Sequence, residues 1–135
     1  MSDFKLTSQE ITWMLKHSAG DTALLFGLIA LRCTERGGPG REMGVLSVHT
    51  DGWEAQIKVA AHTFNSKAFQ FSGGSTFLHD SGTSLYSDDF LTYFSHKYAP
   101  IGADNDPNGL NANHARNLIY YYRKCSGALL RVTDS

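Results

Sequence analysis

An apolar run followed by a glycine-rich break places the strongest constraint on how this chain folds. Residues 23–31 read Ala-Leu-Leu-Phe-Gly-Leu-Ile-Ala-Leu, so a helix through them is apolar on nearly every side. A helix of this kind lies in the middle of a domain and not on its surface. Asp21 is a suitable N-cap, and Gly-Gly-Pro-Gly at 37–40 breaks the helix. The sequence therefore predicts a central helix over about 21–35.

Four further helices are predicted around the central one, because apolar residues recur in them at helical spacing. Their expected ranges are about 8–18, 52–71, 87–98 and 112–125. The residues expected to cap three of them are Thr7 or Ser8, Asp51, and Asn111 or Asn113, and Ser87 with Asp88 and Asp89 is expected to begin the fourth. Residues 43–48, after the glycine-rich break, are expected to form a short strand or an ordered loop.

The number of helices and the chain length predict the fold class. Five helices with little strand indicate a mostly α domain, α+β at most. The chain has 135 residues, of which 41% are apolar, so residues 1–135 are expected to form a single domain around one core.

The charge balance and hydropathy argue against two classes of partner. The net charge of −1 does not suggest a nucleic-acid partner, because phosphate contacts need a basic surplus. No apolar run reaches the roughly 20 residues that span a bilayer, so no membrane insertion is expected. No signal peptide is visible. Cys33 and Cys125 are expected to remain thiols, since a domain of this size needs no disulfide.

Glu35 is the residue that carries the clearest chemical signal, because it lies where the buried helix ends. Burial beside Leu31 and Phe26 and the negative end of the helix dipole both favour the protonated carboxyl group. A carboxylic acid that keeps its proton is what glycosidic cleavage needs to protonate a leaving oxygen. The structural alternative is that Glu35 only pairs with one of the nearby arginines: Arg32, Arg36 or Arg41.

The region around Glu35 resembles the catalytic region of lysozyme-like peptidoglycan hydrolases. In soluble lytic transglycosylases, an apolar helix ends in a Glu, and a loop then leads to a Gly-Leu-Met-Gln segment that lines the cleft. Here Glu35 ends the apolar helix, and Gly-Val-Leu-Ser at 44–47 resembles the second segment. The resemblance implies that Glu35 is the catalytic acid and that Gly44 and Ser47 contact the substrate.

A second resemblance lies in the C-terminal half of the chain. Residues 90–94, 97–100 and 105–111 are similar to the tail of glucosaminidase- and transglycosylase-like domains in phages and bacteria. Trp-Glu-Ala-Gln at 53–56 resembles the start of the helix between the two regions. The similarity covers about residues 22–124 in separated blocks and implies a lysozyme-like domain.

Three further residues are candidates for substrate contact. Tyr98 either reaches Glu35 or the substrate in the cleft or is a core tyrosine of the fourth helix. Tyr121 belongs to three consecutive tyrosines, which cannot all be buried in a helix, so one or two of them are candidates to stack on sugar rings. Glu42 is the candidate second carboxylate nearest to Glu35 in the chain, or a residue that holds the loop. The other candidates for a second carboxylate are Asp51, Glu54 and Asp80.

The resemblance also implies a mechanism. Lytic transglycosylases work with one Glu, the N-acetyl group of the substrate assists, and the product is a 1,6-anhydro sugar. We therefore expect cleavage of the β-1,4 bond between N-acetylmuramic acid and N-acetylglucosamine, by a transglycosylase or a muramidase that acts as a monomer without a cofactor.

Metal and cysteine chemistry are not expected. Asp-Asn-Asp-Pro-Asn-Gly at 104–109 matches the first half of a calcium loop, but position 12 is Ala115 and not the required Glu. The six histidines have no zinc-site spacing. Cys33 lies near the C-terminus of a helix, where the dipole does not activate a thiol.

A second class of function stays open. Thr34 and Arg36 flank Glu35 in place of the usual Glu-Ser pair, and Ser47 replaces the usual Gln. These departures favour, as the alternative, a non-catalytic lysozyme-like module that binds glycan or forms part of a phage tail or secretion apparatus. In either case we expect synthesis in the cytoplasm and action at the cell wall, in the periplasm or from a virion or secretion device.

Overall fold

The computed structural model describes residues 6–35, 41–45, 52–73, 77–104 and 106–134, with side chains described as far as residue 127. Its elements are α1 (Ser8–Ser18), α2 (Thr22–Glu35), α3 (Trp53–Phe71), α4 (Asp88–Tyr98), the short 3₁₀ helix η2 (Leu110–Asn113) and α5 (His114–Asp134). Within the described ranges, the β structure is limited to one antiparallel bridge between His79 and Tyr86. The prediction of a mostly α fold with about five helices is confirmed.

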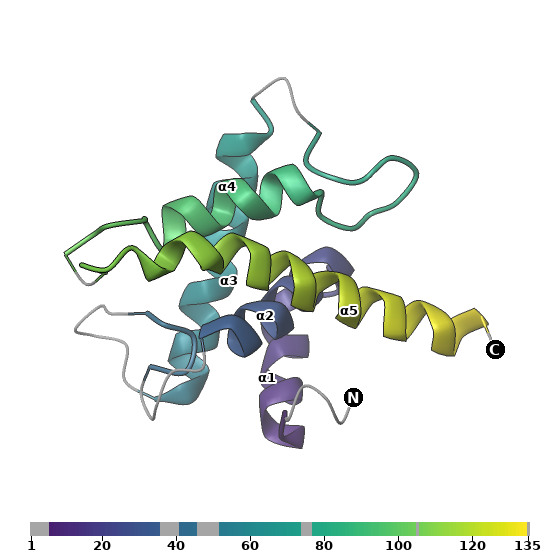
Figure 1. Cartoon of the computed structure of the whole chain (residues 1–135). Helices are drawn as coiled ribbons and strands as arrows, with labels where there is room; N and C mark the ends of the chain where they lie inside the picture. The colour runs from purple at the N-terminus through teal and green to yellow at the C-terminus, as the bar shows by residue number, and fades with distance from the viewer. Residues whose placement is uncertain (1–5, 36–40, 46–51, 74–76, 105, 135) are drawn as a thin grey trace.

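Helix α2 is the central element, as its composition predicts. Leu28, Ala30 and Leu31 are fully buried, and α2 runs behind α5 across the middle of the molecule (Figure 1). The two helices run in opposite directions, since the side chain of Tyr122 reaches Ala23 at the start of α2 and His114 lies beside Glu35 at its end. Among the described residues, no helix is long and apolar enough to cross a membrane.

Two predicted caps, Thr7 and Asp21, are confirmed by hydrogen bonds, and Ser87, predicted to begin the fourth helix, caps it. The Thr7 hydroxyl accepts from the backbone N–H of Glu10 at 3.1 Å, and the Asp21 carboxylate accepts from Leu24 at 3.2 Å. Ser87 accepts from the N–H of Phe90 at 3.1 Å. Each side chain satisfies an N–H that the first helical turn leaves without a partner. Asp51, the cap expected for α3, lies outside the described residues.

The start of the last helix corrects the prediction. Neither Asn111 nor Asn113 caps it, because their side chains bond to Pro100 and to the Arg116 side chain. The buried carboxylate of Asp106 takes this part instead and accepts from the backbone N–H groups of residues 102, 110 and 111. The helix also continues to Asp134, beyond the expected end near 125.

Aromatic stacking joins the helices on the side away from α1. Phe64 of α3 lies flat on Phe94 of α4, with ring centroids 3.8 Å apart. The ring of Phe64 also lies directly over Gly27 of α2, where an added Cβ would come within 3.0–3.3 Å of it. A glycine at this position therefore lets α2 and α3 pack closely.

Candidate functional site

Glu35 lies at the end of α2 with its carboxyl group turned into the molecule. Its side chain is 16% exposed. Gly44 lies directly against the carboxyl group, and a Cβ added there would come within 2.6 Å of Cδ and 2.9 Å of Oε2. Gly44 also has a φ of +74°, a backbone conformation that residues other than glycine rarely adopt. The position therefore requires glycine for two separate reasons.

Gln56 holds the segment that contains Gly44. Its side-chain oxygen accepts from the backbone N–H groups of Met43 at 3.3 Å and Val45 at 3.1 Å, and its amide donates to the Val45 carbonyl at 3.1 Å. Gln56 is fully buried, so these bonds fix the loop to α3 in an environment without competing water. Residues 41–45 form no strand, and 46–48 lie outside the described residues.

Tyr98, at the end of α4, reaches the same loop. Its hydroxyl donates to the carbonyl of Met43, and its ring stacks on Phe94 with centroids 5.1 Å apart. Burial raises the pKa of Tyr98 well above its ordinary value, and the negative charge of Glu35 adds to that shift. Tyr98 therefore is a neutral hydrogen-bond donor close enough to Glu35 to be influenced by its charge.

His114, which the sequence did not single out, also faces the Glu35 carboxyl group. Its Nε2 lies 3.5 Å from Glu35 Oε2, and its Nδ1 lies 2.6 Å from the hydroxyl of Ser95 in α4. His114 is 7% exposed and Ser95 is fully buried. The signal that could have found His114 is its register, because it precedes the buried Leu118 and Tyr122 at intervals of four residues in α5.

The structure brings three of the six predicted site residues together: Glu35, Gly44 and Tyr98. Glu42 belongs to the same short segment as Gly44, and Ser47 lies outside the described residues. Tyr121 is half-buried and stacks on Tyr120, two turns or roughly 10 Å along α5 from His114. Substrate contact by Tyr121 therefore requires a groove that extends along α5.

Of the three arginines in the structural alternative, Arg32 is engaged away from Glu35. The Arg32 guanidinium lies over the ring of Trp53 at 5.3 Å, and its Nε lies 3.9 Å from Glu10 in α1. Arg36 lies outside the described residues.

Two of the candidates for a second carboxylate are engaged elsewhere. Asp80 pairs with Arg123 at 3.0 Å. Glu54 pairs with Lys16 at 2.8 Å and His17 at 3.0 Å. Glu54 is two residues before Gln56 in α3, so the two side chains point about 200° apart around the helix axis. Gln56 faces the loop beside Glu35, and Glu54 therefore faces away from it. Asp51 lies outside the described residues, and Glu42 belongs to the same segment as Gly44.

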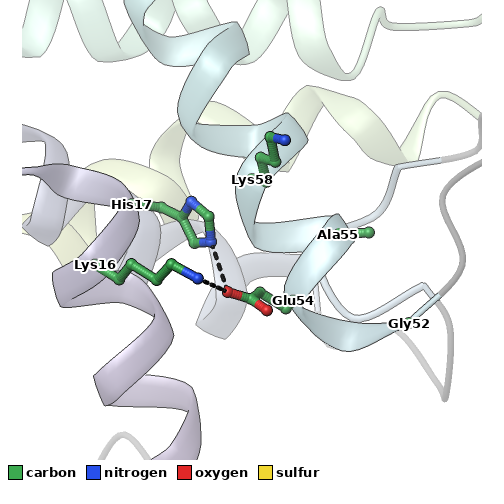
Figure 2. Close-up of a pocket in the computed structure, with 6 residues that line it drawn as sticks. All are labelled: Lys16, His17, Gly52, Glu54, Ala55 and Lys58. Atoms are coloured by element: carbon green, nitrogen blue, oxygen red, sulfur yellow. Dashed lines mark hydrogen bonds and ion pairs between the residues drawn. The ribbon is translucent and has the colours of Figure 1, made fainter.

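A separate pocket of about 380 Å³ lies between α1 and the first turns of α3 (Figure 2). Lys16 and His17 both point toward Glu54 across it. The hydrogen bond from Lys16, and then that from His17, lower the pKa of Glu54 below its ordinary value. This charge cluster joins α1 to α3, on the face of α3 opposite to the Glu35 loop.

The described residues contain no group of His, Cys, Asp and Glu side chains arranged to hold a metal ion. In the partial calcium motif at 104–109, the carboxylate of Asp106 accepts hydrogen bonds from three backbone N–H groups. Cys33 and Cys125 form no disulfide in this structure. Burial, and then the nearby thiol of Cys33, raise the pKa of Cys125 to about 12, which argues against a nucleophilic role at neutral pH.

Comparison with protein-family models, with curated proteins and with solved structures gave no match. The case for a function therefore depends on the residues around Glu35.

Proposed function

We propose that this protein cleaves the glycan strands of bacterial peptidoglycan, at the β-1,4 bond between N-acetylmuramic acid and N-acetylglucosamine, with Glu35 as the general acid. One observation carries the proposal: the partly buried Glu35 carboxyl group lies against Gly44 and close to Tyr98. The resemblance to lysozyme-like enzymes implicates Glu35 and Gly44, and the sequence separately made Tyr98 a candidate for substrate contact. The three residues come from separate segments of the chain.

The surroundings of Glu35 suit proton transfer to a leaving oxygen. The Glu35 side chain is largely removed from water but 16% of it is exposed, and the proposal requires that a substrate oxygen approaches from this exposed side. Glu35 donates its proton to the glycosidic oxygen as the bond breaks. Gln56 and Tyr98 hold the loop on the other side of the carboxyl group, which keeps Gly44 close and the acid in one orientation.

A single-acid mechanism fits these surroundings. Glu54 and Asp80 are engaged in ion pairs away from Glu35. In a lytic transglycosylase, the N-acetyl group of the substrate assists, and the carboxylate then accepts the proton of the C6 hydroxyl as the 1,6-anhydro ring closes. A muramidase would deliver water instead, with Glu42 as the candidate second carboxylate. We favour the transglycosylase outcome, by a monomer that uses no cofactor and acts on the cell wall in the periplasm or from a virion or secretion device.

The test compares wild type with Glu35→Gln on purified peptidoglycan. We expect wild type to clear the suspension and release muropeptides, and Glu35→Gln to be slower by roughly 10²–10⁴-fold. Glu54→Gln is the matched control, because it makes the same change at an ion pair on the far face of α3, and it should retain activity. Mass spectrometry separates the two outcomes, since anhydro ends indicate a transglycosylase and reducing ends a muramidase. Equal release by wild type and Glu35→Gln would refute the proposal.

One observation favours the alternative, a non-catalytic lysozyme-like module of a phage tail or secretion apparatus. The approach of His114 to Glu35 at 3.5 Å is also what a purely structural ion pair would look like. In that case wild type and Glu35→Gln would both sediment with peptidoglycan, and neither would release muropeptides.

A further inference from the structure

Three polar side chains from three helices form a line that ends at Glu35. Ser95 comes from α4, His114 from α5 and Glu35 from α2. The Ser95 hydroxyl is 2.6 Å from Nδ1 of His114, and Nε2 on the other side of the ring is 3.5 Å from Glu35 Oε2. The ring of Tyr98 lies alongside the imidazole, with centroids 6.4 Å apart and planes 26° apart.

This line is not a serine-hydrolase triad. In such triads the hydroxyl faces Nε2 and the carboxylate faces Nδ1, and here the two nitrogens are exchanged. Ser95 is also fully buried, so its hydroxyl cannot meet a substrate carbonyl. The proton at the other end of the line, on the partly exposed Glu35, is the one that a substrate can reach.

The hydrogen bond of Ser95 indicates which nitrogen of His114 carries the proton. Thr34, Thr63 and Thr92 donate their hydroxyls to the backbone carbonyl four residues earlier in their helices. Ser95 makes no such bond, and within the described residues His114 Nδ1 is the one acceptor in range of its hydroxyl. A buried hydroxyl proton without an acceptor is costly, so Ser95 donates to Nδ1 and the imidazole proton is on Nε2.

The Nε2–H group therefore points at Glu35 without forming a full hydrogen bond. The distance of 3.5 Å is long for N–H···O, and Nε2 is a buried nitrogen with no other partner among the described residues. When Glu35 gives up its proton, the carboxylate becomes a stronger acceptor, and charge-assisted hydrogen bonds are shorter and stronger than neutral ones. The contact is thus weak before proton transfer and strong after it.

We infer that His114 is a positioning residue for Glu35: held by Ser95 with its proton on Nε2, it stabilises the carboxylate that forms as Glu35 donates its proton. An interaction that strengthens only as the charge develops raises kcat and leaves substrate binding unchanged. The catalytic part of this inference rests on the proposed function, whereas the position of the imidazole proton does not.

The position of that proton is tested without any substrate. Long-range ¹H–¹⁵N spectra of the ¹⁵N-histidine-labelled protein distinguish the two neutral forms of the ring and the charged one. We expect His114 to be neutral with its proton on Nε2, and to lose that preference in Ser95→Ala. The exposed His96, the next residue in α4, is the control, and its signals should be the same in both proteins. A charged His114, or a proton on Nδ1 in wild type, overturns the inference.

The effect on catalysis is tested by replacing His114. His114→Phe keeps the ring beside Tyr98 but removes the N–H donor, and we expect kcat to fall about 10²-fold with KM within about twofold of wild type. His114→Gln restores a hydrogen-bond donor, and its kcat should be at least a tenth of the wild-type kcat. His96→Phe controls for replacing a histidine elsewhere. An unchanged kcat in His114→Phe, or loss of folding in both His114 variants with wild-type kcat in Ser95→Ala, counts against the inference.

The two proposals fail in different ways. If wild type releases no muropeptides, the proposed function fails, and the spectra still decide whether Ser95 sets the proton on His114. If Glu35→Gln is inactive but His114→Phe is as fast as wild type, the proposed function stands and the positioning role is wrong.

Discussion

At the scale of single residues, the Glu35 site depends on a contact between a glycine and a carboxyl group. Gly44 has a φ of +74° and lies against Glu35, whereas Gly102 has the same φ and nothing within 4 Å of an added Cβ. The two positions share the backbone requirement for glycine and differ only in the contact. They therefore separate backbone strain from the loss of space beside the acid.

We predict that Gly44→Ala destabilises the protein more than Gly102→Ala. Backbone strain alone costs roughly 1–2 kcal/mol, which both variants bear. Gly44→Ala additionally forces the carboxyl group or the loop to move, so the peptidoglycan cleavage that we propose should fall with it. Thermal denaturation and muropeptide release measure the two effects.

A double variant provides the control for this contact. Adding Glu35→Ala to Gly44→Ala removes the carboxyl group that the new methyl group meets, so the cost of the alanine should drop to that of Gly102→Ala. If the cost of Gly44→Ala is the same with and without Glu35, the two residues do not interact as the structure indicates.

At the scale of helices, close approach between α2 and α3 depends on Gly27. Phe64 is fully buried and packed flat between Phe94 and Tyr86, so its ring has little room to move when a side chain is added at Gly27. Gly127, in the interior of α5, meets nothing within 4 Å. The same substitution is therefore expected to have opposite signs at the two glycines.

Gly27→Ala should lower the free energy of unfolding, and Gly127→Ala should raise it. Alanine in place of a helical glycine gains about 1 kcal/mol from helix propensity at either position. Overpacking costs about 1–3 kcal/mol and applies at Gly27 alone. Urea denaturation gives both values, and a stabilised Gly27→Ala would mean that α2 and α3 are less tightly packed.

The start of α5 is stabilised in a pH-dependent way by Asp106. Burial, the largest influence, raises the pKa of this carboxyl, but the N–H groups of residues 102, 111 and 110 outweigh it, and the net pKa lies below the ordinary 3.8. A carboxyl with a lowered pKa stabilises the fold while it is ionised. The contribution is therefore complete above about pH 5 and is lost as the pH falls through 3.8 toward the lower pKa of the folded state.

Asp106→Asn should lower Tm by about 3–6 °C at pH 7, and the difference from wild type should shrink below pH 4. Asp104→Asn, at an exposed position in the same loop, is the control and should change little at either pH. A difference that persists at pH 3 would show that the charge of Asp106 does not account for the effect.

At the scale of the whole molecule, Tyr122 joins parts of the chain that are far apart in sequence. Its hydroxyl accepts from the backbone N–H of Tyr86 at 3.0 Å and donates to the Ala23 carbonyl at 3.1 Å. It thereby connects α5 to the segment before α4 and to the start of α2. The antiparallel pairing of α2 and α5 that this contact anchors also places His114 beside Glu35 at the other end.

Tyr122→Phe should cost about 1–3 kcal/mol of unfolding free energy, because the buried N–H of Tyr86 loses its acceptor. Tyr120→Phe makes the same change at a half-exposed ring and should stay within about 0.5 kcal/mol of wild type. Chemical denaturation of the two variants measures the difference, and equal stabilities would contradict the role of the Tyr122 hydroxyl.

Much of the secondary structure was predictable, and part of the site was not. The caps at Thr7, Asp21 and Ser87 bond to residues three positions ahead, so the sequence displays both partners together. Asp106 instead bonds across a loop on both sides, and no local pattern distinguishes it from an ordinary turn residue. Gln56 lies on the apolar face of its helix, so its burial could have been inferred from the sequence. Its hydrogen-bond partners in the loop could not.

The sequence by itself determined which segments are helical, that α2 is central, and that Glu35 ends it, because these follow from contacts between residues a few positions apart. Only the tertiary structure decided what faces Glu35. Gly44, Tyr98 and His114 come from separate segments, and their approach depends on how α2, α4 and α5 pack against one another. Packing of this kind depends on the shapes of whole helix faces, which no single stretch of sequence contains.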